Sequence, residues 1–122
     1  MSPHSHEAVL LVEDDRHTRE AIRTLLELEG FRVETAENGQ DGLQRLRAGL
    51  RPCVIVLDMM MPVKGGAEFR REQLEDPQLA DIPVVVYSGH DPAIDGKELA
   101  GAAYVKKPID FDVLLNLVRL HC

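Results

Sequence analysis

Five polar side chains stand at the ends of short apolar runs, and together they form a set suited to phosphoryl transfer. They are Glu13, Asp14, Asp58, Ser88 and Lys107. Carboxylates placed together repel one another unless a cation neutralises them, and the hard ion Mg²⁺ suits an all-oxygen site. A carboxylate can accept a phosphoryl group as an acyl phosphate, so Asp58 is the candidate nucleophile. Glu13 and Asp14 would then hold the metal, while Lys107 and Ser88 would bind phosphoryl oxygens.

The run that carries Asp58 sets the expected position of this chemistry. Residues 53–57 are five apolar residues in a row, which is typical of a strand buried on both faces. The run ends at Asp58, and Pro62 follows four residues later. In open α/β sheets, ligands bind at the carboxyl ends of the strands. Taken alone, Asp58 could equally well be a turn residue, so the other strand ends must decide.

The rest of the chain alternates between strand and helix patterns. Strands are expected over 8–12, 31–36, 53–57, 82–87 and 102–106, and helices over 16–29, 38–48, 67–74 and 109–121, with a short, loosely held one over 91–100. Asp15 and Asn38 suit helix N-caps, and the first helix should present Ala21, Ile22, Leu25 and Leu26 on one stripe. This order implies a parallel sheet covered on both faces. The predicted fold is a single three-layer, doubly wound α/β domain over 8–122, preceded by a flexible segment over 1–7.

The composition excludes some classes of protein and favours others. The net charge is −7, from 21 acidic and 14 basic residues, which argues against direct binding of nucleic acid. No apolar run approaches membrane-spanning length. Cys53 and Cys122 form no disulfide or metal pattern, so a reducing compartment and a cytoplasmic location are expected.

Four motifs together resemble a known family. They are Val12-Glu13-Asp14-Asp15, Leu57-Asp58-Met59-Met60-Met61-Pro62, Tyr87-Ser88-Gly89 and Lys107-Pro108. In this order and at these strand ends they resemble the receiver domain of two-component response regulators, including chemotaxis-type regulators, over about residues 8–121. The resemblance implies a flavodoxin-like fold with a five-stranded parallel sheet in the order 2-1-3-4-5.

The resemblance also implies roles for particular residues. Asp58 would be the phosphorylation site, and the main-chain carbonyl of Met60 would join Glu13, Asp14 and Asp58 around Mg²⁺. Lys107 would be the phosphate-binding lysine, and Ser88 and Tyr104 would be the switch residues. The donor would be a sensor histidine kinase or a phosphotransfer protein, and the output a downstream protein target or a fused output domain. Such a domain is no enzyme in its own right, since it assists only its own phosphorylation and dephosphorylation.

The last predicted helix and the loop after Asp58 carry further expectations. Phe111, Leu114, Leu115 and Val118 follow helical spacing and should face the sheet. Val113, Leu117 and Leu120 form a second apolar stripe on that helix, which suggests a docking surface or a phosphorylation-dependent homodimer. Scattered surface leucines are equally ordinary. The residues 63–66 predict a flexible loop, and Gly65 replaces an aspartate frequent in the family.

Two other functional classes remain open from the sequence. One is a small phosphatase or hydrolase that uses Asp58 as a turnover nucleophile, although 122 residues leave little room for a substrate lid. The other is a pseudo-receiver, a binding module that is never phosphorylated, although Asp58, Asp14 and Lys107 are all present. The sequence is compatible both with a regulator that acts alone and with one part of a longer protein.

Overall fold

The structure, a computed structural model, describes residues 8–61, 63–89 and 101–122. Its strands are β1 (Ala8–Val12), β2 (Arg32–Ala36), β3 (Val54–Asp58), β4 (Val84–Ser88) and β5 (Ala103–Lys106). They form a parallel sheet in the order β2-β1-β3-β4-β5. The predicted fold class and strand order are therefore confirmed. Every residue of β1, β3 and β4 is buried, as expected for strands covered on both faces.

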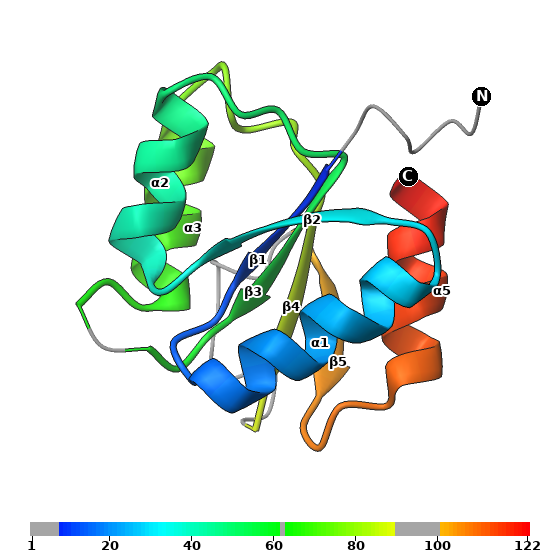
Figure 1. Ribbon diagram of the computed structural model, residues 1–122. Helices are drawn as coiled ribbons and strands as arrows, with labels where there is room; N and C mark the ends of the chain where they lie inside the picture. Colours follow the sequence, from blue (N-terminus) through cyan, green and yellow to red (C-terminus); the bar gives the residue numbers. More distant parts are fainter. Residues whose placement is uncertain (1–7, 62, 90–100) are drawn as a thin grey trace.

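The helices form the two outer layers (Figure 1). They are α1 (Arg16–Leu28), α2 (Gly39–Arg47), α3 (Gly66–Glu75) and α5 (Phe111–His121). Helices α1 and α5 pack on one face of the sheet, and α2 and α3 on the other, each pair with its own apolar core. Among these helices, none is long and apolar enough to cross a lipid bilayer. The segments expected as a flexible start (1–7) and as a fourth helix (91–100) lie outside the described residues.

Local signals predicted the helix starts better than the buried faces. The side chain of Asp15 accepts a hydrogen bond from Thr18 N at 2.9 Å, and that of Asn38 accepts one from Asp41 N at 2.8 Å, so both predicted N-caps are confirmed. The predicted stripe on α1 is only half right. Ile22 and Leu26 are buried, whereas Ala21 and Leu25 are exposed, because only positions i and i+4 of this helix face the sheet.

Helix α5 buries the face that the sequence assigned to the sheet. Leu114, Leu115 and Val118 belong to the core shared with α1. Of the second stripe, Val113 and Leu120 are exposed, by 44% and 74%, but Leu117 packs against the same core. The exposed stripe is therefore shorter than predicted.

The two cysteines form a disulfide, so the expectation that they make no disulfide pattern is wrong. Cys53 lies just before β3 and Cys122 ends the chain after α5, 69 residues away. Their Cα atoms lie 5.4 Å apart because α5 packs on the face of the sheet where Cys53 is buried. The bond therefore joins the start of β3, at the end opposite Asp58, to the residue that follows α5.

Candidate functional site

The carboxyl ends of two neighbouring strands bring three acidic side chains together. Glu13 and Asp14 follow β1, and Asp58 is the last residue of β3. One carboxylate oxygen of each lies within 4.8 Å of the others. Glu13 and Asp58 are each only 2% exposed, while Asp14 is exposed at the rim. The β-α order thus places three predicted site residues at one point.

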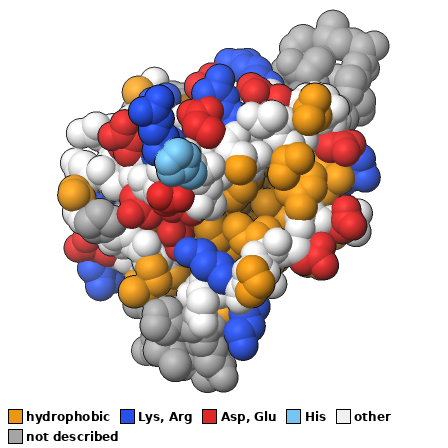
Figure 2. Space-filling model, turned by 60° about the horizontal axis from the view of Figure 1, so that its bottom comes forward, with side chains coloured by type: hydrophobic (Ala, Val, Ile, Leu, Met, Phe, Trp, Pro, Cys, Tyr) orange, Lys and Arg blue, Asp and Glu red, His pale blue; other side chains and the backbone are white. Residues whose placement is uncertain are grey.

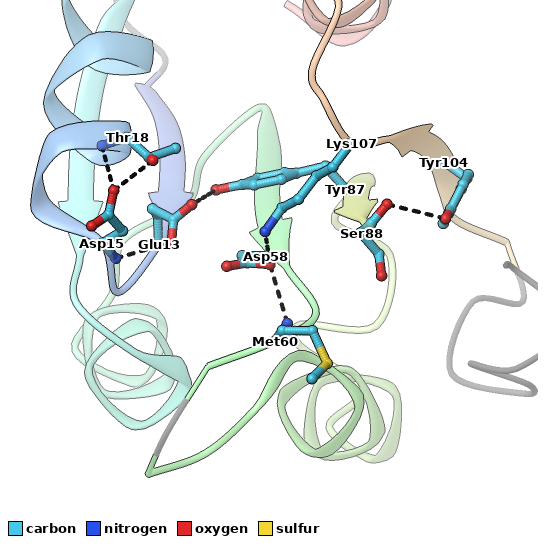
Figure 3. Close-up of polar contacts among 9 residues, drawn as sticks. All are labelled: Glu13, Asp15, Thr18, Asp58, Met60, Tyr87, Ser88, Tyr104 and Lys107. Carbon is cyan, nitrogen blue, oxygen red and sulfur yellow. Dashed lines mark hydrogen bonds and ion pairs between the residues drawn. The ribbon is translucent and has the colours of Figure 1, made fainter. Parts of the chain in front are cut away.

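Lys107 joins this acidic cluster from the loop after β5. Its Nζ lies 3.1 Å from Asp58 Oδ1, and the main-chain N of Met60 donates to the same oxygen at 3.1 Å. Figure 3 shows both donors converging on Asp58. Within the described residues, both hydrogen-bond donors to Asp58 bond to Oδ1. The other oxygen, Oδ2, accepts no hydrogen bond from these residues and points towards Glu13 (Figure 3).

Glu13 is held by two donors, one of which the sequence did not predict. The hydroxyl of Tyr87 donates to Glu13 Oε1 at 2.7 Å, and Asp15 N donates to Oε2 at 3.0 Å. The ring of Tyr87 also lies beneath Lys107, whose Nζ is 5.3 Å from the ring centroid. In the sequence, Tyr87 is the last residue of the apolar run 82–87, and no pattern assigns a role to its hydroxyl. The available signal was that a buried tyrosine hydroxyl requires a hydrogen-bond partner.

Charge and burial shift two pKa values at this site. Although its side chain reaches the rim, partial desolvation raises the pKa of Asp14 above its usual value, and the neighbouring Glu13 carboxylate raises it further. Burial, followed by the charge of Glu13, raises the pKa of Tyr87 far above its ordinary range. Tyr87 therefore stays protonated and remains a hydrogen-bond donor. The raised pKa of Asp14 shows that partial burial and the neighbouring carboxylate both disfavour its charged form.

Ser88 and Tyr104, the predicted switch residues, lie on the neighbouring strands β4 and β5: Ser88 ends β4, and Tyr104 is the second residue of β5, opposite Val86. Ser88 is completely buried, and its main-chain oxygen accepts hydrogen bonds from Tyr104 Oη at 3.3 Å and from Lys107 N at 2.9 Å. The first of these bonds is drawn in Figure 3. One main-chain carbonyl thus connects the serine, the tyrosine and the segment that carries the lysine.

The described part of the loop between β3 and α3 is fastened at several points. Gly66 N donates to Met59 O at 3.1 Å, and Gly39 N of α2 donates to Lys64 O at 3.0 Å. The Lys64 ammonium also pairs with Glu72 of α3. A Cβ at position 66 would lie 2.6 Å from Met59 Cα, so this close approach requires glycine. These contacts hold against α2 and α3 a loop that the sequence predicted to be flexible.

An apolar hollow of about 370 Å³ adjoins the acidic cluster. Its lining residues are Thr18, Ala21, Ile22, Lys107, Pro108 and Ile109. Figure 2 shows a hollowed area of hydrophobic side chains next to a group of acidic ones. Because Lys107 belongs to both the hollow and the ion pair with Asp58, a partner seated in the hollow would reach the acidic cluster.

Comparison with known proteins decides the family. Residues 9–119 match the family model of the response regulator receiver domain. The chain belongs to this family. Its acidic pocket of Glu13, Asp14 and Asp58 fits the phosphoacceptor site of a receiver domain, and a receiver domain is a signalling domain.

Curated relatives and solved structures agree with this assignment. The chain is 38% identical to the C4-dicarboxylate transport transcriptional regulatory protein DctD of Pseudomonas aeruginosa over 91% of this chain but 24% of DctD. It is 31% identical to Protein PilH of the same organism, over 91% of this chain and 93% of PilH. The response regulator TrrA of Thermotoga maritima, solved in complex with Mg(2+)-BeF, superposes with a TM-score of 0.83 at 26% identity, covering 95% of this chain and 99% of that one. The chain spans about a quarter to a half of the length of the first curated relatives that it matches.

Proposed function

We propose that this receiver domain, residues 8–122, accepts a phosphoryl group on Asp58 in His–Asp phosphorelay signalling. The observation that carries the proposal is the buried Asp58 carboxylate, which lies in an acidic cluster and is paired with Lys107 through one oxygen only. That pairing leaves Oδ2 to attack phosphorus. The product is an acyl phosphate, a known form of carboxylate nucleophilic chemistry.

The acidic cluster has the donor set of a magnesium site. Glu13, Asp14 and Asp58 would hold Mg²⁺, with the main-chain carbonyl of Met60 as a further ligand. Three carboxylates within 4.8 Å of one another offer only oxygen to a hard cation. When bound, the ion supplies positive charge that offsets the charge on the phosphoryl oxygens. The complex of TrrA with Mg(2+)-BeF supports this proposal by family relationship.

The transfer itself exchanges one bond for another. Asp58 Oδ2 forms a bond to phosphorus while the N–P bond of a phosphohistidine breaks, and the electron pair of that bond stays on the imidazole nitrogen. Lys107 binds one of the phosphoryl oxygens, because its ammonium already lies at Asp58. The domain supplies the acceptor and the positive charge and is itself modified once in each transfer, so it is a signalling domain and not a turnover enzyme.

The phosphoryl donor is a sensor histidine kinase or a phosphotransfer protein. Its histidine must come within bonding distance of Asp58, so the donor has to cover the rim around Lys107. The apolar hollow shares Lys107 with the site and is lined by Ala21, Ile22 and Ile109. An apolar face of the donor that fills this hollow would bring its phosphohistidine to the rim.

The proposed switch is formed by Ser88 and Tyr104. A phosphoryl group on Asp58 adds strong acceptor oxygens, and the Ser88 hydroxyl would turn towards one of them. Because the Ser88 carbonyl carries the hydrogen bond from Tyr104, a shift of Ser88 is felt by Tyr104 on β5. The output is a change in the protein surface that a downstream target or a fused output domain reads.

The proposal also includes the cellular location and the oligomeric state of the domain. We place the domain in the cytoplasm because its family acts with two-component phosphoryl donors; unpaired cysteines do not support this location, since Cys53 and Cys122 form a disulfide. The exposed Val113 and Leu120 of α5, with part of Leu117, are the proposed contact of a phosphorylation-dependent homodimer.

Incubation with Mg²⁺ and acetyl phosphate tests the proposal. Mass spectrometry of the intact protein should show the gain of one phosphoryl group per chain, and Asp58→Asn should show none. Continuous release of phosphate over many turnovers would instead indicate a phosphatase. No mass gain, with the fold intact by circular dichroism, would indicate a pseudo-receiver.

A further inference from the structure

Tyr87 is a buried polar side chain that the proposed chemistry does not use. None of its side chain is exposed, and it packs in the core between the sheet, α1 and α5. In the sheet it stands opposite Asp58 of β3, whereas Glu13 follows β1 on the other side of β3. The side chain of Tyr87 therefore crosses over β3 to reach Glu13 (Figure 3).

The contact at the end of this span is a short hydrogen bond to a buried acid. Tyr87 Oη lies 2.7 Å from Glu13 Oε1, and Asp15 N lies 3.0 Å from Oε2. The two donors hold the two carboxylate oxygens, so the orientation of Glu13 is fixed. Because Glu13 is only 2% exposed, water is poorly placed to replace either donor, and loss of one leaves a buried charge less well satisfied.

The same ring touches the basic side of the site. Lys107 Nζ lies 5.3 Å from the ring centroid of Tyr87, within the range of a cation–π contact. Lys107 in turn pairs with Asp58. One side chain of β4 thus contacts an acid of the candidate metal site through its hydroxyl and the phosphate-binding lysine through its ring.

We propose that Tyr87 is a positioning residue of the divalent-cation site. Its hydroxyl holds the Glu13 carboxylate in the orientation in which Glu13, Asp14 and Asp58 take up Mg²⁺. The inference rests on the proposed function, since it concerns the ion that the acidic cluster holds. Hydrogen-bond donors behind a metal-binding carboxylate typically account for about 10–100-fold in metal affinity. Tyr87 acts through Glu13 and touches neither the ion nor the phosphoryl group.

Tyr87→Phe tests the inference, because it removes the hydroxyl and keeps the ring beneath Lys107. Mg²⁺ is titrated into the full chain while NMR follows the amide shifts of Asp15 and Met60, which bond to Glu13 and Asp58 respectively. The expected result is Mg²⁺ affinity weaker by about tenfold. Val85→Ala, on the same strand and in the same core, is the matched control: it lowers stability but should leave Mg²⁺ affinity unchanged.

A double-mutant cycle shows whether the effect passes through Glu13. In a Glu13→Gln background, adding Tyr87→Phe should change Mg²⁺ affinity by less than twofold, because the carboxylate that Tyr87 positions is gone. Unchanged or tighter Mg²⁺ binding in the single Tyr87→Phe variant would overturn the inference and leave the proposed function standing. A wild-type chain that binds no Mg²⁺ would overturn both. If Tyr87→Phe weakened Mg²⁺ binding as much in the Glu13→Gln background as in the wild type, Tyr87 would not act through Glu13. That result would overturn the positioning role and leave the proposed function standing.

Discussion

The ammonium of Lys107 lies 3.1 Å from Asp58 Oδ1, and this ion pair joins a carboxylate that is 2% exposed to a lysine that is 36% exposed. A buried carboxylate is costly unless it is paired or hydrogen-bonded. Before any phosphorylation, Lys107 therefore stabilises the charge of Asp58. In the proposed transfer, Lys107 would then bind a phosphoryl oxygen from the same position.

Replacement of Lys107 should weaken both the fold and the chemistry. In Lys107→Met, the main-chain N of Met60 is the donor to Asp58 that remains among the described residues, so the free energy of unfolding should fall. We expect a loss of about 1–2 kcal/mol, less than the roughly 3–5 kcal/mol for a fully buried pair, because Lys107 is partly exposed. Phosphorylation by acetyl phosphate should fall at least tenfold. Lys106→Met, an adjacent exposed lysine of β5, should leave both measurements nearly unchanged. Equal urea denaturation curves for Lys107→Met and the wild type would count against the structural role of the pair.

Asp14 should lower the stability of the metal-free protein at neutral pH. Its pKa is raised above 3.8 in the folded chain, so the folded state binds this proton more tightly than the unfolded state. The contribution of Asp14 to the free energy of unfolding therefore falls as the pH rises from its ordinary pKa of 3.8 through its higher pKa in the folded protein. Without Mg²⁺ at pH 7, Asp14→Asn should raise the Tm by about 2–4 °C.

Asp14→Asn should also abolish the stabilisation by Mg²⁺ that we expect for the wild type, since an ion that binds only the folded state raises the Tm. Asp15→Asn is the matched control with one charge fewer. Since hydrogen bonds from Thr18 lower the pKa of Asp15, its removal should give no rise in Tm. An Asp14→Asn protein that melts at or below the wild-type Tm without Mg²⁺ would contradict this account.

The sequence predicted the parts of the site that follow from strand ends. Asp58, Glu13 and Lys107 could be placed at one rim because apolar runs of strand length end at them, and parallel strands share a carboxyl edge. The Tyr87–Glu13 contact could not be predicted, since it depends on a side chain that crosses the intervening strand β3.

Contacts between elements that lie far apart in the chain could not be predicted from the sequence either. The pairing of Cys53 with Cys122 depends on how α5 lies on the sheet, which no local pattern encodes. The exposure of Ala21 has a similar cause, because helical periodicity gives a stripe but not its width.

Ser88 should be needed for the switch and dispensable for phosphorylation. Its main-chain oxygen carries the bond from Tyr104, while its hydroxyl is the group that a phosphate would attract. Ser88→Ala should accept phosphate from acetyl phosphate to the same final level. The NMR shift change of the Tyr104 amide on phosphorylation should shrink by more than half. A full wild-type change in this variant would rule out the coupling.

The disulfide should stabilise the fold without serving the site. A cross-link between Cys53 and Cys122, 69 residues apart, lowers the entropy of the unfolded chain. It should thereby raise the free energy of unfolding by about 2–4 kcal/mol. Cys122→Ser should therefore unfold at lower urea than the oxidised wild type, and a reductant should lower the stability of the wild type but not of the variant. Mg²⁺ affinity should stay the same, because the bond lies at the opposite end of β3 from Asp58. Wild-type stability that does not respond to a reductant would contradict the prediction.

The proposed function requires that one carboxylate, Asp58, accepts the phosphoryl group. After incubation with Mg²⁺ and acetyl phosphate, borohydride reduction converts an aspartyl phosphate to homoserine, and peptide mass spectrometry locates the change. We expect homoserine at position 58 alone, in the wild type and not in Asp58→Asn. Modification of Glu13 or Asp14 instead, or an unmodified position 58 in a protein that folds and binds Mg²⁺, would contradict the proposed function.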